Sequence, residues 1–336
     1  MKVKLSIVVP CYNEAKNIPL ILERFSSVIH RVDIEVILVT NGSTDNSSII
    51  LDEYLPKYSF ARSVNIEVNE GYGHGIVTGL TQAIGEFVGY THADMQTDPA
   101  DLLKALEIIE EYLKDYNFPS ETAKKLTTIS LINYTAAAIL MPYKLFYDEC
   151  RKHRYDLELL QHTFSVSFEQ VAHRVTCLQD PKMKGIPFHM LRTDIAGNIS
   201  KRLSLSGIQI PRYGGACPRW NIHSAFMLPG KIHSALSKMP DGEKYVCIAR
   251  TIEKGIGRHG VYRSILSIGL GCQAQYAKDF IYADTLNLKD ETSATAIGVN
   301  CRTCPRMDCQ QRAFPPINKN LDINFNNRGP SAYVSG

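Results

Sequence analysis

Short runs of β-branched and other apolar residues alternate with helical stretches over the first third of the chain, and this alternation restricts the fold most. The apolar runs lie at 5–9, 34–39 and 87–90, and the stretches with helical spacing lie at 17–29, 47–55 and 101–112. Strands that are short and continuously apolar are buried on both faces, as in a parallel sheet covered by helices on each side. We therefore predict a three-layer α/β unit built on a parallel sheet.

Polar clusters follow the predicted strands, and they lie at 12–14, 41–45 and 92–96. In parallel α/β sheets, ligands bind beyond the carboxyl ends of the strands, which is where these clusters fall. Asp45 precedes a helix, so it suits a helix N-cap as well as a ligand contact. Asp94 suits a turn or, together with His92 and Gln96, a hard divalent cation. Gly71 and Gly73 would let the backbone approach a phosphate, although the spacing of a dinucleotide fingerprint is absent.

Taken together, four segments resemble the nucleotide-sugar half of inverting family 2 glycosyltransferases with the A-type fold; they are 8–14, 41–47, 69–75 and 93–99. The resemblance implies a partial A-type fold that binds a nucleotide-diphospho-sugar. The side chains that it places around the nucleoside are Pro10, Tyr12, Glu14 and Asp45. It also implies that Asp94 and Gln96 hold Mg²⁺ or Mn²⁺ at the diphosphate.

The resemblance is incomplete in two ways. His92 stands where the family usually has the first Asp of its Asp-x-Asp motif, and a neutral imidazole is a poorer partner for a hard cation than a carboxylate. The resemblance also ends after residue 112, before the acceptor site and the general base that transfer requires. We therefore expect nucleotide-sugar binding more than sugar transfer, and no catalytic residue is assigned.

Charge and cysteine content change near residues 113–121, where we place a boundary. Residues 1–117 contain 9 Lys and Arg against 17 Asp and Glu, whereas the remaining 219 residues contain 28 against 17. Cys11 lies in the first part and the other eight cysteines follow residue 149. No apolar run has the length of a membrane span, and the polar N-terminus does not suit a signal peptide, so we expect a cytoplasmic protein. An odd cysteine count then favours metal binding or buried thiols over disulfides.

A helical segment is expected next, over 122–140, 143–153, 155–161 and 167–178, with Ser167 as an N-cap. Residues 135–142 and 164–167 resemble the end of the ImmA/IrrE metallopeptidase-like domain. That family binds zinc through a His-Glu-x-x-His motif and a downstream Glu, whose place Glu121 would take. No His-Glu-x-x-His motif occurs in the sequence, so we do not expect zinc peptidase activity.

The chain beyond residue 187 mixes strands, expected at 188–192, 245–250 and 264–269, with a basic loop region. The basic side chains Lys201, Arg202, Arg212 and Arg219 surround the loop 214–218, which precedes the only tryptophan, Trp220. Such a cluster is either a solvated basic face or a site for an anionic ligand, with guanidinium groups on phosphates.

Cysteines provide the strongest chemical signal. Cys301, Cys304 and Cys309 lie within nine residues of one another, and Cys272 lies upstream. Four thiolates suit a structural zinc ion as well as an iron–sulfur cluster, and the spacing does not choose between them. The polar neighbours of these cysteines speak against buried thiols without a metal.

Residues 122–317 resemble the C-terminal part of short-chain fatty-acyl-CoA-responsive transcription regulators. The resemblance rests on 154–156, 197–202, 212–221, 269–272, 282–284 and 297–309. It implies a sensor of short-chain acyl-CoA with a [4Fe–4S] cluster on Cys301, Cys304 and Cys309, with Cys272 as the fourth ligand and Cys217 as an alternative. From charge and aromatic content we place the CoA phosphates near Lys201, Arg202 and Arg212, and Tyr213 and Trp220 beside them.

The expected organisation is therefore a chimera: a glycosyltransferase-like unit (1–117), a helical ImmA/IrrE-like remnant (118–180), an α+β cysteine-rich acyl-CoA-sensing domain (181–317) and a disordered tail (318–336). The leading hypothesis is an acyl-CoA-sensing regulatory module, and the alternatives are an active glycosyltransferase and a chimera without function. Residues 1–117 do not read as a helix-turn-helix domain, so we expect no sequence-specific DNA binding, only salt-sensitive contacts to a phosphate backbone. Self-association into a homo-oligomer stays open.

Overall fold

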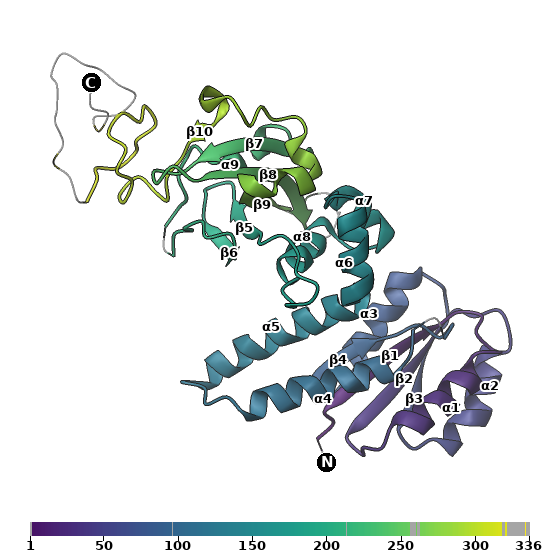
Figure 1. Ribbon diagram of the computed structural model, residues 1–336. Coiled ribbons are helices and arrows are strands. Elements are labelled where there is room, and N and C mark those ends of the chain that lie inside the picture. Colours follow the sequence, from purple (N-terminus) through teal and green to yellow (C-terminus); the bar gives the residue numbers. More distant parts are fainter. Residues whose placement is uncertain are drawn as a thin grey trace. The chain divides into compact units, whose positions relative to one another are not determined.

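The computed structural model describes residues 2–95, 97–212, 214–255, 260, 263–317, 320 and 333 (Figure 1). Gln96, Tyr213 and almost all of the predicted tail lie outside these described residues. The chain divides into two compact units, Met1–Ile139 and Leu140–Gly336. The two units are described separately below.

The first unit is built on a four-stranded parallel sheet of order β3-β2-β1-β4. Its strands are β1 (Leu5–Cys11), β2 (Ile34–Asn41), β3 (Ala61–Ile66) and β4 (Phe87–Tyr90). Every residue of β1 and β2 is buried, because these central strands are covered on both faces. The predicted parallel three-layer architecture is confirmed.

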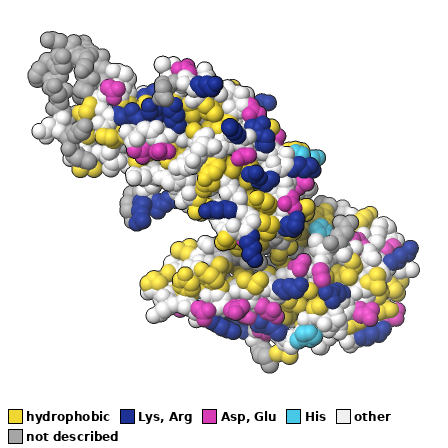
Figure 2. Space-filling view, in the orientation of Figure 1, with side chains coloured by type: hydrophobic (Ala, Val, Ile, Leu, Met, Phe, Trp, Pro, Cys, Tyr) yellow, Lys and Arg dark blue, Asp and Glu magenta, His cyan; other side chains and the backbone are white. Residues whose placement is uncertain are grey.

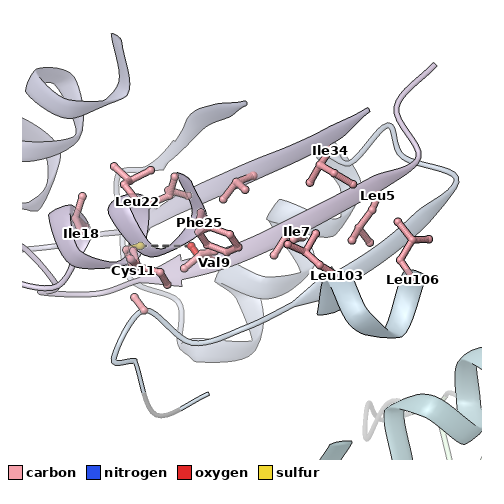
Figure 3. Packing of buried hydrophobic residues seen from close by; sticks show 14 of the residues in the cluster. Leu5, Ile7, Val9, Cys11, Ile18, Leu22, Phe25, Ile34, Leu103 and Leu106 are labelled. Carbon is pink, nitrogen blue, oxygen red and sulfur yellow. Dashed lines mark hydrogen bonds between the residues drawn. The ribbon is translucent and has the colours of Figure 1, made fainter. Parts of the chain in front are cut away.

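Helices cover both faces of this sheet. They are α1 (Ile18–Val28), α2 (Ser47–Tyr54), α3 (Tyr72–Gln82), α4 (Ala100–Lys114) and α5 (Glu121–Leu140), with a short 3₁₀ turn at Leu55–Lys57. Figure 3 shows the odd-numbered residues of β1, such as Ile7 and Val9, packed against Phe25 of α1 and Leu103 of α4. The opposite face carries Val8, against which α3 packs so closely that a Cβ on Gly79 would lie 2.3 Å from it.

Helix α5 is grouped with the first unit, yet only Ala137 of its twenty residues is buried. Leu131 and Ile132 pack against the core, whereas Leu126 is 61% exposed and Ile129 is 55% exposed. Figure 2 accordingly shows hydrophobic side chains on the surface of the first unit. Within the described residues no single helix is long and apolar enough to cross a bilayer, and only the broken pair of α5 with the next helix passes that test of length and composition.

The second unit opens with three helices, namely α6 (Tyr143–Lys152), α7 (Leu157–Thr163) and α8 (Phe168–Thr176). Helix α8 begins at a complete capping box, in which the Ser167 hydroxyl accepts a hydrogen bond from the Gln170 N–H and the Gln170 side chain accepts one from the Ser167 N–H. The predicted N-cap at Ser167 is thereby confirmed.

A six-stranded sheet of order β10-β7-β8-β9-β5-β6 follows, antiparallel except for the β10–β7 pair. The strands are β5 (His189–Asp194), β6 (Ile199–Ser204), β7 (His233–Lys238), β8 (Lys244–Lys254), β9 (Ser264–Gln273) and β10 (Thr295–Ala296). Short helical segments lie at α9 (Asn221–Ser224), Ala225–Met227, Ala274–Asp279, Ile281–Ala283 and Glu291–Ser293. The α+β character expected for this unit is confirmed.

The register gives this sheet two distinct faces. Leu191 pairs with Gly269 and Gly269 with Ala249, and a Cβ on Gly269 would lie 3.1 Å from Ile222 of α9, so these residues define the α9 face. The next residues along each strand point to the other side, which we call the α8 face. Glu169 of α8 bonds to Arg192 there. This alternation tells on which face of the sheet each strand residue of the unit lies.

Candidate functional sites

A cavity of about 280 Å³ lies beyond the carboxyl ends of β1 and β4 in the first unit. Its lining consists of Pro10, Cys11, Tyr12, Glu14, Asn41, Asn69, Tyr72, His92, Ala93 and Asp94. The sequence-predicted residues Pro10, Tyr12, Glu14, His92 and Asp94 are therefore brought together. Asn41, Asn69 and Tyr72 were not predicted as site residues, although each lies within or beside a segment that carries the family resemblance.

Asp45 does not line the cavity but holds the loop that does. Its carboxylate accepts hydrogen bonds from the backbone N–H of Ala15 (3.1 Å) and of Ser47 (3.0 Å). Burial raises the pKa of Asp45, but the bonds from Ser47 and the backbone outweigh this effect, so the pKa lies below its ordinary value. The Asn13 side-chain oxygen accepts the N–H of Thr44 at 2.8 Å, which links the same two loops again.

Tyr72 and His92 form one wall of the cavity. Their rings stack with centroids 5.7 Å apart, and the Tyr72 hydroxyl lies 3.0 Å from His92 Nδ1. Gly71, in the left-handed region with φ of 102°, begins α3, and its carbonyl accepts a bond from the Asn41 amide at 3.0 Å. The Asn41 side-chain oxygen is buried and has no partner among the described residues.

For a divalent cation, the structure supplies the Asp94 carboxylate, which is a hard oxygen ligand. Gln96, the second predicted ligand, lies outside the described residues. Over the part of the chain that is described, no three His, Cys, Asp or Glu side chains converge on one point as a metal ion requires.

In the second unit, Cys217 lies beside the cysteine segment 301–309. Its backbone N–H donates to the Val299 carbonyl at 3.0 Å. Burial, followed by the proximity of Cys301 and Cys304, raises the pKa of the Cys217 thiol, while hydrogen bonds from two backbone N–H groups oppose the rise. Chain segments more than eighty residues apart in sequence thus bring three cysteines into one region.

Gly298 and Trp220 fix this region against the sheet. The Trp220 indole donates to the Gly298 carbonyl at 2.9 Å. A Cβ on Gly298 would lie 2.7 Å from Cys304 Sγ, so only glycine permits this approach. Cys301 Sγ accepts the backbone N–H of Ala313 at 3.4 Å.

Cys272 is not part of this cluster, contrary to the sequence-based expectation of a fourth ligand. It pairs with Val246 in the β8–β9 register, and its side chain is fully buried on the α8 face. Cys217 instead belongs to the core cluster on the α9 face. The sheet itself separates the two sulfur atoms, and the alternative that the sequence offered, Cys217, is the one brought to the loop.

The predicted CoA-binding residues are also divided between the two faces. Lys201 pairs with Arg192 on the α8 face, where its ammonium group lies 3.6 Å from Glu169. Arg202 points to the α9 face and donates to the Pro211 carbonyl at 3.0 Å. Trp220 is buried on that face, and Tyr213 lies outside the described residues. Arg212 is exposed and directly follows Pro211, the residue to which Arg202 donates, whereas Lys201 lies on the other face of the sheet.

A small cavity of about 10 Å³ lies on the α9 face. Among its lining residues, His189 is fully buried, and its ring lies 2.8 Å from the Ser206 hydroxyl through Nδ1 and 3.8 Å from Cys247 Sγ through Nε2. Burial lowers the pKa of His189 to about 3, so the imidazole is neutral. The cavity has room for about one water molecule, so it offers no preformed space for an acyl chain.

Comparison with known proteins follows the same division. Residues 177–333 match the family model described as short-chain fatty acyl coenzyme A regulator, C-terminal, and residues 6–155 match glycosyl transferase family 2. The chain joins segments of two families. The glycosyltransferase match runs to residue 155, further than the resemblance seen in the sequence, which ended after residue 112.

Individual relatives agree with both segments. The HTH-type transcriptional regulator RamB of Mycobacterium tuberculosis is 41% identical over 230 residues, which is 68% of this chain and 48% of RamB. The undecaprenyl-phosphate 4-deoxy-4-formamido-L-arabinose transferase of Yersinia enterocolitica is 31% identical over 112 residues, 32% of this chain and 34% of that enzyme. The chain thus spans about half the length of the curated regulator that it matches.

A solved structure also matches. The structure of a Mycobacterium tuberculosis transcriptional regulator superposes with a TM-score of 0.70 and 29% identity, covering 96% of this chain and 89% of that one.

Proposed function

We propose that the regulator segment holds a metal centre on the thiolates of Cys217, Cys301, Cys304 and Cys309. The observation that carries this proposal is the position of Cys217, which the fold delivers from a distant loop to the side of Cys301 and Cys304. An iron–sulfur cluster accepts four thiolates, as a zinc ion does. When bound, either group would cross-link the two loops.

The surroundings of the sulfur atoms suit such a group. Backbone N–H groups of Arg219 and Gly298 donate to the Cys217 sulfur, and the N–H of Ala313 donates to Cys301. Donors aimed at sulfur favour the thiolate, the form that binds metal, and at Cys217 they oppose the burial that raises the pKa of the thiol. Among the described residues the four cysteines do not converge on one point, so metal binding would require the loops that carry them to move together.

Two serine variants test this ligand set. Cys217→Ser should lower the iron or zinc content of anaerobically purified protein by at least half, because one of four ligands is lost. Cys272→Ser is the matched control and should leave the metal content unchanged, since its sulfur lies on the other face of the sheet. Metal loss on Cys272→Ser but not on Cys217→Ser would refute the assignment, and zinc without iron would exclude the cluster.

We also propose that the regulator segment senses a short-chain acyl-CoA. Its support is the family match over residues 177–333 and the bond from Arg202 to the carbonyl of Pro211, the residue before Arg212; the guanidinium groups of both arginines suit phosphates. Propionyl-CoA or acetyl-CoA at a hundred times its dissociation constant should stabilise the folded protein by about 2.7 kcal/mol. The shift in melting temperature should shrink in Arg212→Gln and persist in Lys201→Gln, and an equal shift with unacylated CoA would argue against acyl sensing.

A nucleotide-diphospho-sugar is the second proposed ligand, bound in the cavity of the first unit. The specific support is the cavity of about 280 Å³, which brings together Tyr12, Tyr72 and Asp94 from three of the family-like segments. In a thermal melt, UDP-sugars with Mn²⁺ should raise the melting temperature of the wild-type protein but not that of Asp94→Ala. Release of UDP with transfer of the sugar to an acceptor, abolished in Asp94→Ala, would establish an active glycosyltransferase instead of a binding unit.

A further inference from the structure

Arg312 is a buried arginine at the centre of the cysteine segment. Arg312 is only 2% exposed, and its guanidinium group donates hydrogen bonds to four backbone carbonyls. Two of these belong to cysteines: Cys301 O at 2.7 Å and Cys304 O at 3.1 Å. The others are the carbonyls of Arg306 and Phe314.

A buried guanidinium is costly unless its N–H groups find acceptors, so the chain around Arg312 is folded to provide them. The acceptors span residues 301 to 314, so one planar group fixes the path of the whole segment. No regular helix or strand occurs over this segment. Without Arg312 the carbonyls of Cys301 and Cys304 would lose these hydrogen bonds, and the Cys304 backbone would keep only the bond from its N–H to the Asn300 carbonyl among those described.

The other two arginines of the segment, Arg302 and Arg306, make different contacts. Arg302 is exposed and lies over the Phe314 ring at 5.0 Å. Arg306 donates to the Lys238 carbonyl at 3.1 Å, which ties the segment to the end of β7. Neither contacts the carbonyl of a cysteine in the bonds described for the segment, so Arg312 alone combines burial with direct bonds to two cysteine residues.

We infer that Arg312 is a positioning residue for the thiolate metal centre. The inference rests on the proposed metal centre. The guanidinium holds the backbone of Cys301 and Cys304 in one conformation before metal binds. Four thiolates carry more negative charge than the metal neutralises, and the buried positive charge of Arg312 offsets part of the excess. Groups that orient metal ligands from behind typically change metal affinity by about 10–100-fold when removed.

A cobalt titration of the full chain tests the inference. Apo protein is prepared anaerobically, and Co²⁺ affinity is measured from the thiolate-to-cobalt charge-transfer absorption, which reports metal bound to sulfur and not folding alone. Arg312→Gln should bind Co²⁺ about 10–100-fold more weakly than wild type. Arg312→Lys, which keeps the charge but has fewer donors, should fall between them, and the exposed control Arg302→Gln should match wild type.

Alkylation of the buried thiols of Cys150 and Cys272 reports whether each variant is folded, because both are fully buried outside the cysteine segment. A folded Arg312→Gln variant with wild-type cobalt affinity would overturn the inference while leaving the metal centre intact. If Arg312→Gln unfolds, Arg312→Lys decides by the same comparison. Wild type that binds no Co²⁺ through sulfur would overturn the metal centre and this inference together.

Discussion

At the scale of single residues, the neutral buried imidazole of His189 makes the stability of the second unit depend on pH. Its pKa is lowered to about 3 by burial, against about 6.5 in an unfolded chain. The unfolded state therefore binds a proton that the folded state does not, and stability is lost as the pH falls below 6.5. The expected contribution is about 1.4 kcal/mol per pH unit.

Chemical denaturation between pH 7 and pH 4.5 measures this slope. His189→Gln should flatten it, even though the variant is less stable at pH 7. His173, whose pKa is lowered to about 4 chiefly by burial, contributes in the same direction and sets the slope that remains. A slope unchanged by His189→Gln would contradict the prediction.

A second residue-scale prediction concerns Gly271. A Cβ at this position would lie 2.6 Å from the His189 ring and 2.8 Å from the Val246 carbonyl, which is fixed in the β8–β9 ladder. Gly271→Ala should destabilise the second unit by about 1–3 kcal/mol, measured by urea unfolding. Gly73→Ala, with nothing within 4 Å of its new Cβ, should be neutral or slightly stabilising.

The sequence was more informative about residue types than about residue partners. Five residues of the glycosyltransferase-like motifs line one cavity, because the strands of a parallel sheet end at the same edge, and their role in nucleotide binding stays a prediction. The sequence did not reveal that Lys201 and Arg202 lie on opposite faces of the sheet, or that Cys272 lies on the opposite face from Cys217. Neighbouring strand residues point to opposite faces, and only the strand register determines which face each residue takes. Register depends on long-range pairing, which local patterns do not contain.

At the scale of elements, the capping box of α8 makes a measurable contribution. Ser167→Ala removes the acceptor for the Gln170 N–H and should lower the free energy of unfolding by about 1 kcal/mol. Ser167→Asn retains a good N-cap and should restore most of the loss. Equal stability of Ser167→Ala and wild type in urea would show that α8 is held by packing alone.

Element prediction succeeded where burial was continuous and failed at the edges. Strand β4 was predicted with its observed bounds, whereas β3 was missed because this edge strand alternates half-buried and exposed polar residues. Strand β6, the other edge strand, was missed for the same reason, and β7, which lies between β10 and β8, was missed because its residues are mostly polar or small. Edge strands obtain their stability from one neighbour and from register, so their local sequence signal is weak.

At the scale of the whole molecule, the chain should unfold as two units and not as one. Each unit has its own hydrophobic core, on either side of residue 139. Calorimetry should show two transitions, of which only one shifts with acidification through His189 and with acyl-CoA. Nucleotide-sugar should move the other, and a single transition that responds to both ligands would contradict this division.

The burial of Trp220 gives the molecule a built-in optical probe. It is the only indole in the sequence, it is 5% exposed, and its N–H bonds to the Gly298 carbonyl beside Cys304. Excitation at the red edge of the protein absorption band, where tyrosine does not absorb, therefore reports on the second unit alone. An iron–sulfur cluster on the neighbouring sulfur atoms absorbs visible light and would quench this emission by energy transfer, whereas zinc would not. The fluorescence lifetime of Trp220 in the folded protein therefore distinguishes the two occupants.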